Sequence, residues 1–351
     1  MEIWLDNTIF SLQRAGGISG IWAMLISRLQ KIAGLRLRYV ERPDAADNIF
    51  RQRLEIPADS IIDDYRLPLI LTRYMRVRTE AACPFIFHSP YYRRCSSQLA
   101  RNIVTLHDFV YERCGTHGDI ATKVHVAQKT DALRHADAIA AVSASTLDDM
   151  HELYPDINVR STVIHNAPIC IPGNPPGRQQ NTPDYALFVG ARAGYKNFHL
   201  AAEAVKGTHI RLTVAGAPLN ADEKHKYASM LDSGQMTIVE YPGDRELSRL
   251  YTSALCLLYP SDYEGFGIPI VEAQAHGCPV ITSTCRACLE ASGNAVISLS
   301  EMTARAWRGA MLSLTELDPR DRLIAAGLRN AAEYSAETMA KKYVNLYESL
   351  L

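Results

Sequence analysis

The sequence predicts an α/β protein made of two domains, each a parallel sheet covered by helices. Short apolar runs alternate with helical segments in both halves of the chain, and strands joined through helices pair in parallel. Residues 167–183 separate the two series, and they are too rich in proline and glycine for a helix or a central strand. A length of 351 residues suits two such domains with a linker between them.

The first series fills residues 1–166. The strands expected there cover residues 2–6, 35–40, 85–87, 102–106, 138–142 and 163–164. Helices are expected over about 18–33 and 122–136, and a third after Ser143, whose hydroxyl suits an N-cap.

The second series fills residues 184–332, with helices between its strands. The strands expected there cover residues 185–189, 211–215, 237–241, 255–259 and 280–282. The last segment, 333–351, contains an amphipathic helix over 336–351. The two sheets would leave a ligand cleft between the domains.

The composition excludes several classes of protein. A net charge of −1 gives no general attraction to nucleic acid. No apolar run approaches the roughly 18 residues of a membrane span, and no secretory signal is evident at the N-terminus. The eight cysteines lie mostly in apolar stretches, which fits a reducing cytoplasm. Cys285 and Cys288 have the spacing of metal ligands, but no second pair completes a zinc site, so no metal is expected.

Two glutamates flank a glycine-rich turn after the strand 255–259. Glu264 lies in the turn, and Glu272 lies about one turn inside a helix expected over 268–276, where Pro269 suits the first turn. Two carboxylates beside a helix N-terminus can accept hydrogen bonds from a polyhydroxyl ligand, and the N-terminus itself favours a phosphate. A helix-capping glutamate and a solvent-facing glutamate are the structural alternative.

Two cations follow the strand 185–189. Arg192 and Lys196 come after the turn at Gly190, and together they could neutralise a diphosphate. A solvated basic loop is the structural alternative.

The first domain carries two weaker signals at strand ends. Gly16 and Gly17 precede a helix and could expose N–H groups to a phosphate or sugar, although such a pair is also a common turn. His107 ends the strand 102–106, where it could contact a ligand or be a buried core histidine.

Residues 264–272 resemble the E-x7-E signature of the retaining GT-B glycosyltransferases of family 4, the glycosyl transferases group 1. Residues 188–198 are similar to the VG-x-R-x3-KN segment of the same family. The resemblance covers most of the chain and is most specific over 186–292. It implies a GT-B fold with two Rossmann-like domains, an acceptor-side domain at 1–166 and a donor-binding domain at 184–332. It also implies that the helix of 333–351 crosses back to the first domain.

The resemblance implies a role for each motif residue. Glu264 would contact the donor sugar, Glu272 would accept the ribose hydroxyls, and Arg192 and Lys196 would hold the diphosphate and stabilise it as it leaves. His107 would lie near the donor sugar. The remaining implied donor contacts are Gly16, Gly17, Gly190, Gly243, Phe266, Gly267 and Ile268. Neither a metal nor another cofactor is expected, because the cations and the helix N-terminus already face the diphosphate.

The expected reaction is transfer of a sugar, mannose or a related hexose, from a GDP-sugar to a glycan or lipid-linked glycan in polysaccharide or O-antigen assembly. UDP-sugars stay open as donors. A glycoside hydrolase that uses the carboxylate pair is one alternative, and a non-catalytic nucleotide-sugar-binding protein is another.

Two surface predictions concern the first domain. The cluster of His88, Tyr91, Tyr92 and Arg93 is expected either to line the acceptor side or to pack as a surface loop. Six arginines, with apolar and tyrosine residues among them, could contact the cytoplasmic face of a membrane or form a solvated basic face. They are Arg73, Arg76, Arg78, Arg93, Arg94 and Arg101.

Overall fold

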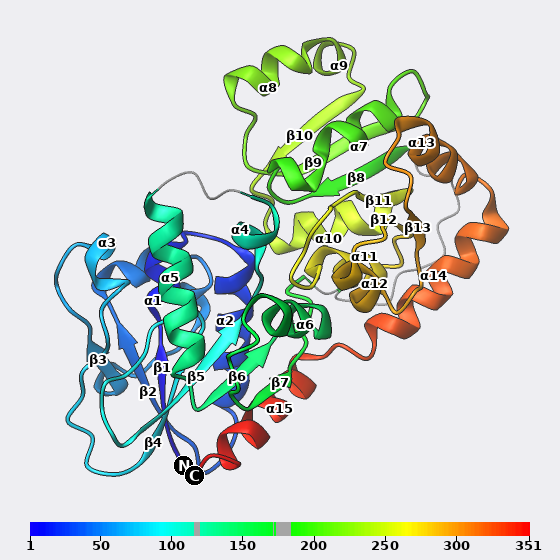
Figure 1. The fold of residues 1–351 in the computed structure, drawn as a ribbon. Coiled ribbons are helices and arrows are strands. Elements are labelled where there is room, and N and C mark those ends of the chain that lie inside the picture. The colour runs from blue at the N-terminus through cyan, green and yellow to red at the C-terminus, as the bar shows by residue number, and fades with distance from the viewer. Residues whose placement is uncertain (116–119, 171, 173–183) are drawn as a thin grey trace. The chain divides into compact units, whose positions relative to one another are not determined.

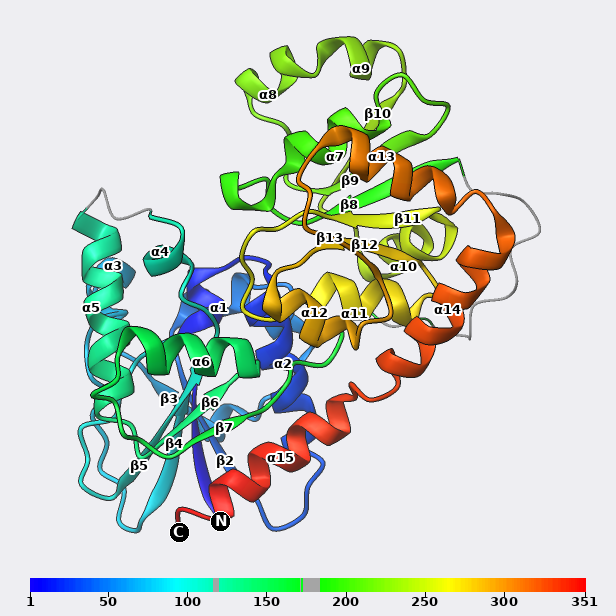
Figure 2. The same cartoon turned by 45° about the vertical axis from the view of Figure 1, so that its right-hand side comes forward.

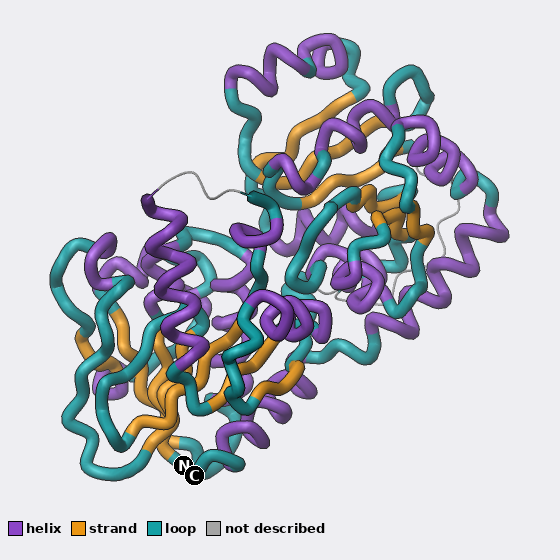
Figure 3. The backbone as a smooth tube through the Cα atoms, viewed as in Figure 1, coloured by secondary structure: helices purple, strands orange, loops and turns teal. Residues whose placement is uncertain are grey.

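The computed structural model describes residues 1–115, 120–170, 172 and 184–351 (Figure 1). The chain forms two compact units, one of residues Met1–Ile169 with Ser335–Leu351 and one of residues Cys170–Tyr334. Most of the expected linker, residues 171 and 173–183, lies outside the described residues. Figure 3 shows that strands and helices alternate along both units.

The first unit is built on a parallel sheet with the order β3-β2-β1-β4-β5-β6-β7. The two strands β1 and β4 are adjacent and parallel, and the order in which the chain adds strands to the sheet reverses between them. The strands are β1 (Glu2–Asp6), β2 (Arg36–Glu41), β3 (Ile61–Asp63), β4 (Phe85–Ser89), β5 (Ala100–Leu106), β6 (Ala138–Ala141) and β7 (Ser161–Val163).

Helices cover this first sheet, and the final helix of the chain is one of them. They are α1 (Thr8–Leu12), α2 (Gly17–Leu29), α3 (Leu69–Thr72), α4 (Val110–Arg113), α5 (Ile120–Arg134), α6 (Ala144–Leu153) and α15 (Ala336–Glu348). The helix α15 lies beside α2, as Figure 2 shows, and Glu337 pairs with Arg28 at 2.6 Å. Tyr347 of α15 also bonds His88 of β4.

The second unit has a parallel sheet with the order β10-β9-β8-β11-β12-β13, which reverses between β8 and β11. Its strands are β8 (Tyr185–Val189), β9 (Arg211–Gly216), β10 (Met236–Glu240), β11 (Cys256–Tyr259), β12 (Val280–Ser283) and β13 (Ile297–Leu299). Its helices are α7 (Phe198–Val205), α8 (Ala221–Lys226), α9 (Ala228–Asp232), α10 (Asp244–Ser253), α11 (Ile268–Ala275), α12 (Arg286–Ser292), α13 (Ala304–Ser313) and α14 (Leu317–Ala331).

Both faces of the second sheet are buried. Successive residues of β8 enter different apolar clusters, because side chains alternate along a strand. Phe188 packs with Phe198 of α7 on one face, while Leu187 packs with Ile270 of α11 on the other. This double covering is typical of parallel sheets, and it leaves only the strand ends and their loops open to a ligand.

The predicted fold class is confirmed. Every strand expected from the sequence is present within a few residues, and all the sheet pairs are parallel. The sequence missed β3 and β13, which lie at the edges of their sheets. Each has three residues and so shows little of the alternation by which a strand is recognised; β7 is equally short and was predicted only through its apolar end at 163–164.

Candidate functional site

The loops after β8 and β11 meet where the strand order of the second sheet reverses. Ligands of open α/β sheets bind at such a reversal, beyond the carboxyl ends of the strands. Lys196 comes from the β8 loop and Glu264 from the β11 loop, and their Nζ and Oε1 atoms lie 2.7 Å apart. The backbone N–H of Asp262 also donates to the Tyr195 carbonyl at 2.8 Å. The two loops are therefore held to each other by a charged and a neutral contact.

The Lys196–Glu264 pair is largely shielded from water. The two side chains are 14% and 12% exposed. Burial opposes the charge on Lys196, but the Glu264 carboxylate outweighs it and raises the pKa of Lys196. The ammonium also lies 5.5 Å from the ring centroids of Tyr195 and Tyr259. Lys196 is thus a permanent cation in a partly dry environment, where its attraction for a second anion is stronger than in water.

The Glu264 loop turns sharply into α11. Gly267 has a φ of 106°, in the region that disfavours residues with a side chain, and Pro269 occupies the first turn as predicted. The Phe266 ring is buried and meets Tyr334 edge to face, with centroids 5.5 Å apart. Ile268 is the first residue of α11. The buried Phe266 ring therefore anchors the loop, and the backbone after it continues directly into the N-terminus of α11.

Glu272 lies inside α11 and is only 5% exposed, so the alternative of a solvent-facing glutamate is wrong. Its Oε1 accepts the N–H of Cys170 at 2.9 Å, and its Oε2 accepts the Tyr251 hydroxyl at 3.0 Å. Burial, together with the Glu272 charge, raises the pKa of Tyr251 well above its ordinary value, so Tyr251 remains a donor. Each carboxylate oxygen can accept a further hydrogen bond, as a ribose contact would require.

Arg192 has partners other than those of Lys196. Its guanidinium bonds Glu223 through Nε and Nη2 at 2.7 and 3.0 Å, and it donates to the carbonyls of Ala217 and Pro218 at 2.8 Å each. Glu223 is held in the capping box of α8. The side chain of Arg192 is 7% exposed, so the alternative of a solvated basic loop does not describe it.

Two of the predicted glycines mark strand ends in the second unit. Gly190 follows β8 with a φ of 119°, and its carbonyl lies 2.8 Å from the place of a Cβ on Gly216. The ends of β8 and β9 are therefore too close for a side chain at Gly216. Gly243 is the residue before α10, with open space around it.

The predicted residues of the first unit lie at two loops. Gly16 and Gly17 begin α2, where the Gln13 Oε1 atom accepts the N–H of Ser19 at 3.3 Å. The Nε2 atom of His107 lies 2.9 Å from the Pro90 carbonyl. Because a carbonyl only accepts, Nε2 carries the proton and Nδ1 is an acceptor. Burial lowers the pKa of His107 although Asp108 opposes it, so the ring is neutral near pH 7.

The expectation that His88 and Arg93 line an acceptor surface is wrong. His88 is fully buried between Tyr347 and Thr105, which its ring nitrogens meet at 2.7 and 2.8 Å. The Arg93 side chain is also fully buried, because it pairs with two aspartates from other strand ends.

Sequence reasoning missed this arginine cluster. Arg93 Nη1 lies 3.0 Å from Asp6 and 2.8 Å from Asp64, and it also contacts the Thr8 hydroxyl. The cluster fills the reversal between β1 and β4, the counterpart of the place where Lys196 and Glu264 meet in the second unit. An aspartate at the end of β1 was a usable signal, but its partner is 87 positions away.

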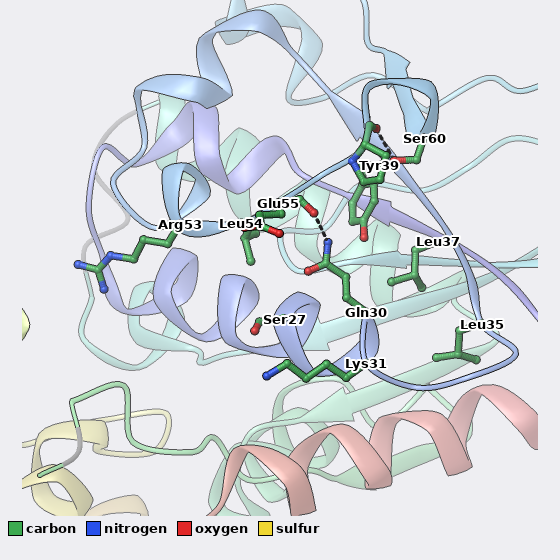
Figure 4. Close-up of a pocket in the computed structure, with 11 residues that line it drawn as sticks. Ser27, Gln30, Lys31, Leu35, Leu37, Tyr39, Arg53, Leu54, Glu55 and Ser60 are labelled. Atoms are coloured by element: carbon green, nitrogen blue, oxygen red, sulfur yellow. Dashed lines mark hydrogen bonds between the residues drawn. The ribbon is translucent and has the colours of Figure 1, made fainter. Parts of the chain in front are cut away.

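A cavity of about 560 Å³ lies on the first unit, between the end of α2 and the start of β2 (Figure 4). Gln30 and Lys31 line it, with Tyr39, Arg53 and Glu55. It contains none of the predicted site residues. Within residues 1–115, 120–170, 172 and 184–351, no cluster of three or more His, Cys, Asp or Glu side chains could hold a metal ion.

Comparison with known proteins gives a consistent picture. The family described as glycosyl transferases group 1 matches residues 175–329, which include Arg192, Lys196, Glu264 and Glu272. The O-antigen chain mannosyltransferase B of Escherichia coli is 26% identical over 286 residues, covering 76% of this chain and 74% of that protein.

Two solved structures share the fold over nearly their whole length. Sucrose-phosphate synthase from Thermosynechococcus elongatus matches with a TM-score of 0.72 at 16% identity, covering 100% of this chain and 99% of that one. Anabaena HepE, solved with UDP and glucose, matches with a TM-score of 0.68 at 13% identity, covering 99% and 100%. At these identities the likeness concerns the fold alone.

Proposed function

The chain belongs to the glycosyl transferases group 1 family of retaining GT-B glycosyltransferases, and we propose that it moves mannose from GDP-mannose to a glycan or lipid-linked glycan acceptor. The main observation in support of a donor site is the Lys196–Glu264 ion pair, which lies where the strand order of the second sheet reverses. It supplies a cation for the diphosphate and a carboxylate for sugar hydroxyls at one place.

The proposed division of labour follows from the chemistry of the two side chains. An ammonium has three donors, so Lys196 can keep its bond to Glu264 and still donate to a phosphate oxygen. Negative charge grows on the diphosphate as its bond to the sugar breaks, and a cation already in place stabilises that charge. Glu264 then orients the sugar, and Glu272 accepts the ribose hydroxyls.

Arg192 is proposed as the second cation of the diphosphate site. Its bonds to Glu223 and to two backbone carbonyls fix the guanidinium in one orientation. A fixed planar cation near the end of β8 would complement the compact point charge of Lys196. His107 is proposed as a positioning residue, because its neutral ring presents Nδ1 as an acceptor for a sugar hydroxyl.

The proposed reaction retains the configuration of the sugar. The acceptor hydroxyl attacks the anomeric carbon on the face that the diphosphate leaves, and the hydroxyl proton passes to a diphosphate oxygen. No protein base is required in this route. Chemistry of this kind depends mainly on positioning and charge stabilisation, which the Lys196 loop can supply.

The choice of donor rests on the relatives. The Escherichia coli relative is named as a mannosyltransferase of the O-antigen chain, which supports a mannose donor and a polysaccharide acceptor. UDP is the nucleotide in the structure of Anabaena HepE, so a UDP-sugar is the main alternative to GDP-mannose as the donor.

We also propose that the first unit meets the acceptor at a membrane surface. In the part of the chain that the structure describes, no helix has the length and apolar character needed to cross a bilayer. Large apolar side chains are nevertheless exposed on α3 and α5, which lie side by side in Figures 1 and 2: Ile70 at 72%, Leu71 at 54%, Ile120 at 80% and Val124 at 41%.

The basic residues near α3 and α5 refine this membrane proposal. Arg93 takes no part, because it is buried, and Arg94 pairs with Asp131 at 2.6 Å. Arg76 and Arg78 are exposed after α3 and remain suitable for anionic lipid headgroups.

A transfer assay tests the proposed function. Purified protein is incubated with GDP-mannose, UDP-glucose and UDP-N-acetylglucosamine, each with a polyprenyl diphosphate glycan acceptor, and the products are separated by mass. We expect a single added hexose with GDP-mannose, in the same anomeric configuration as the donor. Cleavage of a glycoside without any nucleotide sugar would instead support a hydrolase, and binding of nucleotide without turnover would support a regulator.

A further inference from the structure

His125 lies among three tyrosine rings in the first unit. Its ring centroid is 5.4 Å from that of Tyr91, 5.6 Å from that of Tyr92 and 5.2 Å from that of Tyr111. The first two tyrosines come from the loop after β4 and the third from α4, whereas His125 is on α5. Arg73, at the end of α3, has its guanidinium carbon 5.6 Å from the centroid of the Tyr91 ring. Four segments of the first unit therefore contribute to one aromatic cluster.

Tyr92 takes part in this cluster with an unfavourable backbone conformation. Its φ is 63°, in the left-handed region that residues with a side chain rarely adopt. Tyr92 is only 4% exposed, and its ring packs against those of Tyr91 and His125. Strained conformations of this kind concentrate at ligand sites. The backbone of Tyr92 is therefore a first indication that the cluster binds something.

Three buried polar atoms of the cluster have no hydrogen-bond partner among the residues that the structure describes. They are Nε of Arg73, Nδ1 of His125 and Oε1 of Gln128, which lies one turn after His125 on α5. They make up three of the six such side-chain atoms in the described residues. Buried polar atoms are nearly always bonded, so three of them in one cluster indicate a ligand that supplies the missing partners.

The orientation of the Gln128 amide is fixed by its other end. Its Nε2 donates to the Arg73 carbonyl at 2.5 Å, and because a carbonyl only accepts, the nitrogen and not the oxygen must face it. The next residue, Lys129, is buried too, but it donates to Glu112 at 2.8 Å and to the Asp108 carbonyl at 3.1 Å. The protein thus satisfies the buried lysine of α5 while the neighbouring amide oxygen has no partner in the described chain.

The unpaired atoms include a donor and an acceptor. Arg73 Nε donates, and Gln128 Oε1 accepts. Burial, with the nearby cations Lys129 and Arg73, lowers the pKa of His125 to about 4, so its ring is neutral near pH 7 and Nδ1 can take either role. A phosphate requires donors alone, whereas sugar hydroxyls both donate and accept. Aromatic rings beside a few polar atoms of both kinds therefore suit a sugar better than an anion.

The cluster shares a loop contact with a residue of the proposed transfer. Pro90, which precedes Tyr91, has its carbonyl 2.9 Å from Nε2 of His107. His107 is the residue proposed to contact the donor sugar from the first unit. A sugar bound at the cluster would therefore lie next to a loop that His107 holds.

The cluster also adjoins the exposed apolar surface of α3 and α5. Ile70 is one turn before Arg73 and is 72% exposed, and Val124 is next to His125 and is 41% exposed. These apolar side chains belong to the surface proposed to meet a membrane. A site beside them is well placed for the glycan of a lipid-linked acceptor.

We propose that Arg73, Tyr91, Tyr111, His125 and Gln128 form a binding site for one sugar residue of the acceptor glycan. The assignment of that sugar to an acceptor rests on the proposed function. Tyr91 and Tyr111 are partly exposed, and a movement of their rings admits the sugar to the buried atoms. The sugar hydroxyls then pair with the nitrogens of Arg73 and His125 and with the oxygen of Gln128.

Nuclear magnetic resonance of the full chain labelled with 15N-histidine tests the site. The protein is titrated with methyl α-mannopyranoside and, separately, with inorganic pyrophosphate, and the Nδ1 resonance of His125 is identified by its loss in His125→Phe. We expect the mannoside to shift this resonance to a saturating value and pyrophosphate to leave it in place. A shift with pyrophosphate alone would identify an anion site instead, and no shift with either probe would overturn the site.

Transfer kinetics and stability separate binding from packing. His125→Phe keeps an aromatic ring but removes the unpaired nitrogen. With GDP-mannose as donor, we expect the acceptor KM to rise about three- to tenfold, the effect of losing one hydrogen bond, and the donor KM to stay unchanged. The melting temperature should not fall, because an apolar atom replaces a buried polar atom that had no partner. A lower melting temperature with an unchanged acceptor KM would assign His125 to packing alone.

A second variant and a matched control complete the comparison. Gln128→Met should raise the acceptor KM in the same way. Gln52→Met should not, because Gln52 is exposed, although its Nε2 also donates to a backbone carbonyl, that of Ala46 at 2.9 Å. Equal acceptor KM values for the native chain, His125→Phe and Gln128→Met would overturn the site and leave the proposed function intact. A mannoside shift at His125 in a protein that transfers no sugar from any nucleotide donor would instead sink the proposed function and leave the sugar site.

Discussion

Lys196 and Glu264 form an ion pair of 2.7 Å between two loops that lie 68 positions apart in the chain. The loops follow β8 and β11, the adjacent strands at which the sheet order reverses. A buried pair of this kind has a cost in desolvation that its mutual attraction does not always exceed. Its position at the ligand edge of the sheet is therefore better explained by binding than by stability.

The first prediction concerns turnover. Lys196→Ala removes the cation from the leaving diphosphate, so we expect kcat to fall by roughly a hundredfold or more. Steady-state kinetics with GDP-mannose, the proposed donor, measures this. Lys206→Ala is the matched control, because Lys206 is exposed and pairs with the neighbouring, exposed Glu203 at 3.4 Å. Equal rates for the two variants would remove Lys196 from the mechanism.

The second prediction separates a structural from a ligand role of Glu272. In Glu272→Gln, one of the two accepting oxygens is replaced by an NH2 group, which is itself a donor. That group then faces another donor, either the Cys170 N–H or the Tyr251 hydroxyl. We expect a loss of about 1–3 kcal/mol in the free energy of unfolding, because a buried donor becomes unsatisfied. Urea denaturation of this variant and of Glu240→Gln, at an exposed strand end, gives the comparison. An unchanged stability with a raised donor KM would show that Glu272 serves only the ligand.

The third prediction concerns the buried cluster of the first unit. Arg93→Met leaves Asp6 and Asp64 buried without their cation, so we expect a loss of about 3–5 kcal/mol in stability. Arg66→Met removes an exposed pair with Asp63 and should cost less than about 1 kcal/mol. Thermal unfolding of the two variants side by side measures the difference. Similar melting temperatures would mean that the Arg93 cluster contributes little to folding.

The fourth prediction concerns pH and His88. Burial lowers the pKa of His88 to about 3, well below its value in an unfolded chain. The unfolded state therefore binds more protons as the pH falls below about 6.5. The contribution of a neutral His88 is complete above that pH and is lost progressively towards pH 3.

His88→Gln tests this dependence. The variant keeps polar groups for Tyr347 and Thr105 but has no proton to bind, so its stability should fall less steeply than that of the native chain between pH 6.5 and 4. Denaturation at several pH values measures the two slopes. Parallel curves would mean that His88 does not contribute to the acid sensitivity of the first unit.

The sequence was sufficient for the fold and for the two loops that carry the proposed donor site. Apolar strands of four or more residues between helical segments can be recognised from the local pattern of residues. Lys196 and Glu264 could be placed because each lies in the loop that follows such a strand. Contacts over long separations were not predictable. The bond from Cys170 to Glu272 spans 102 positions, and nothing near either residue indicates it.

The same reason explains the errors. His88 and Arg93 are polar residues at a strand end, where local pattern favours a surface. They are buried because partners from β1, the segment after β3, β5 and α15 satisfy their hydrogen bonds. Burial of a polar side chain depends on such partners, and a single sequence does not reveal them.

The most direct test of a nucleotide site at Lys196 and Glu264 is calorimetric titration with GDP, which needs no acceptor. We expect the native chain and Lys206→Ala to bind GDP equally, and Lys196→Ala to bind it about ten- to a hundredfold more weakly. Equally tight binding of GDP by Lys196→Ala and the native chain would contradict a role of Lys196 in the site, and a native chain that bound neither GDP nor UDP would contradict the site itself.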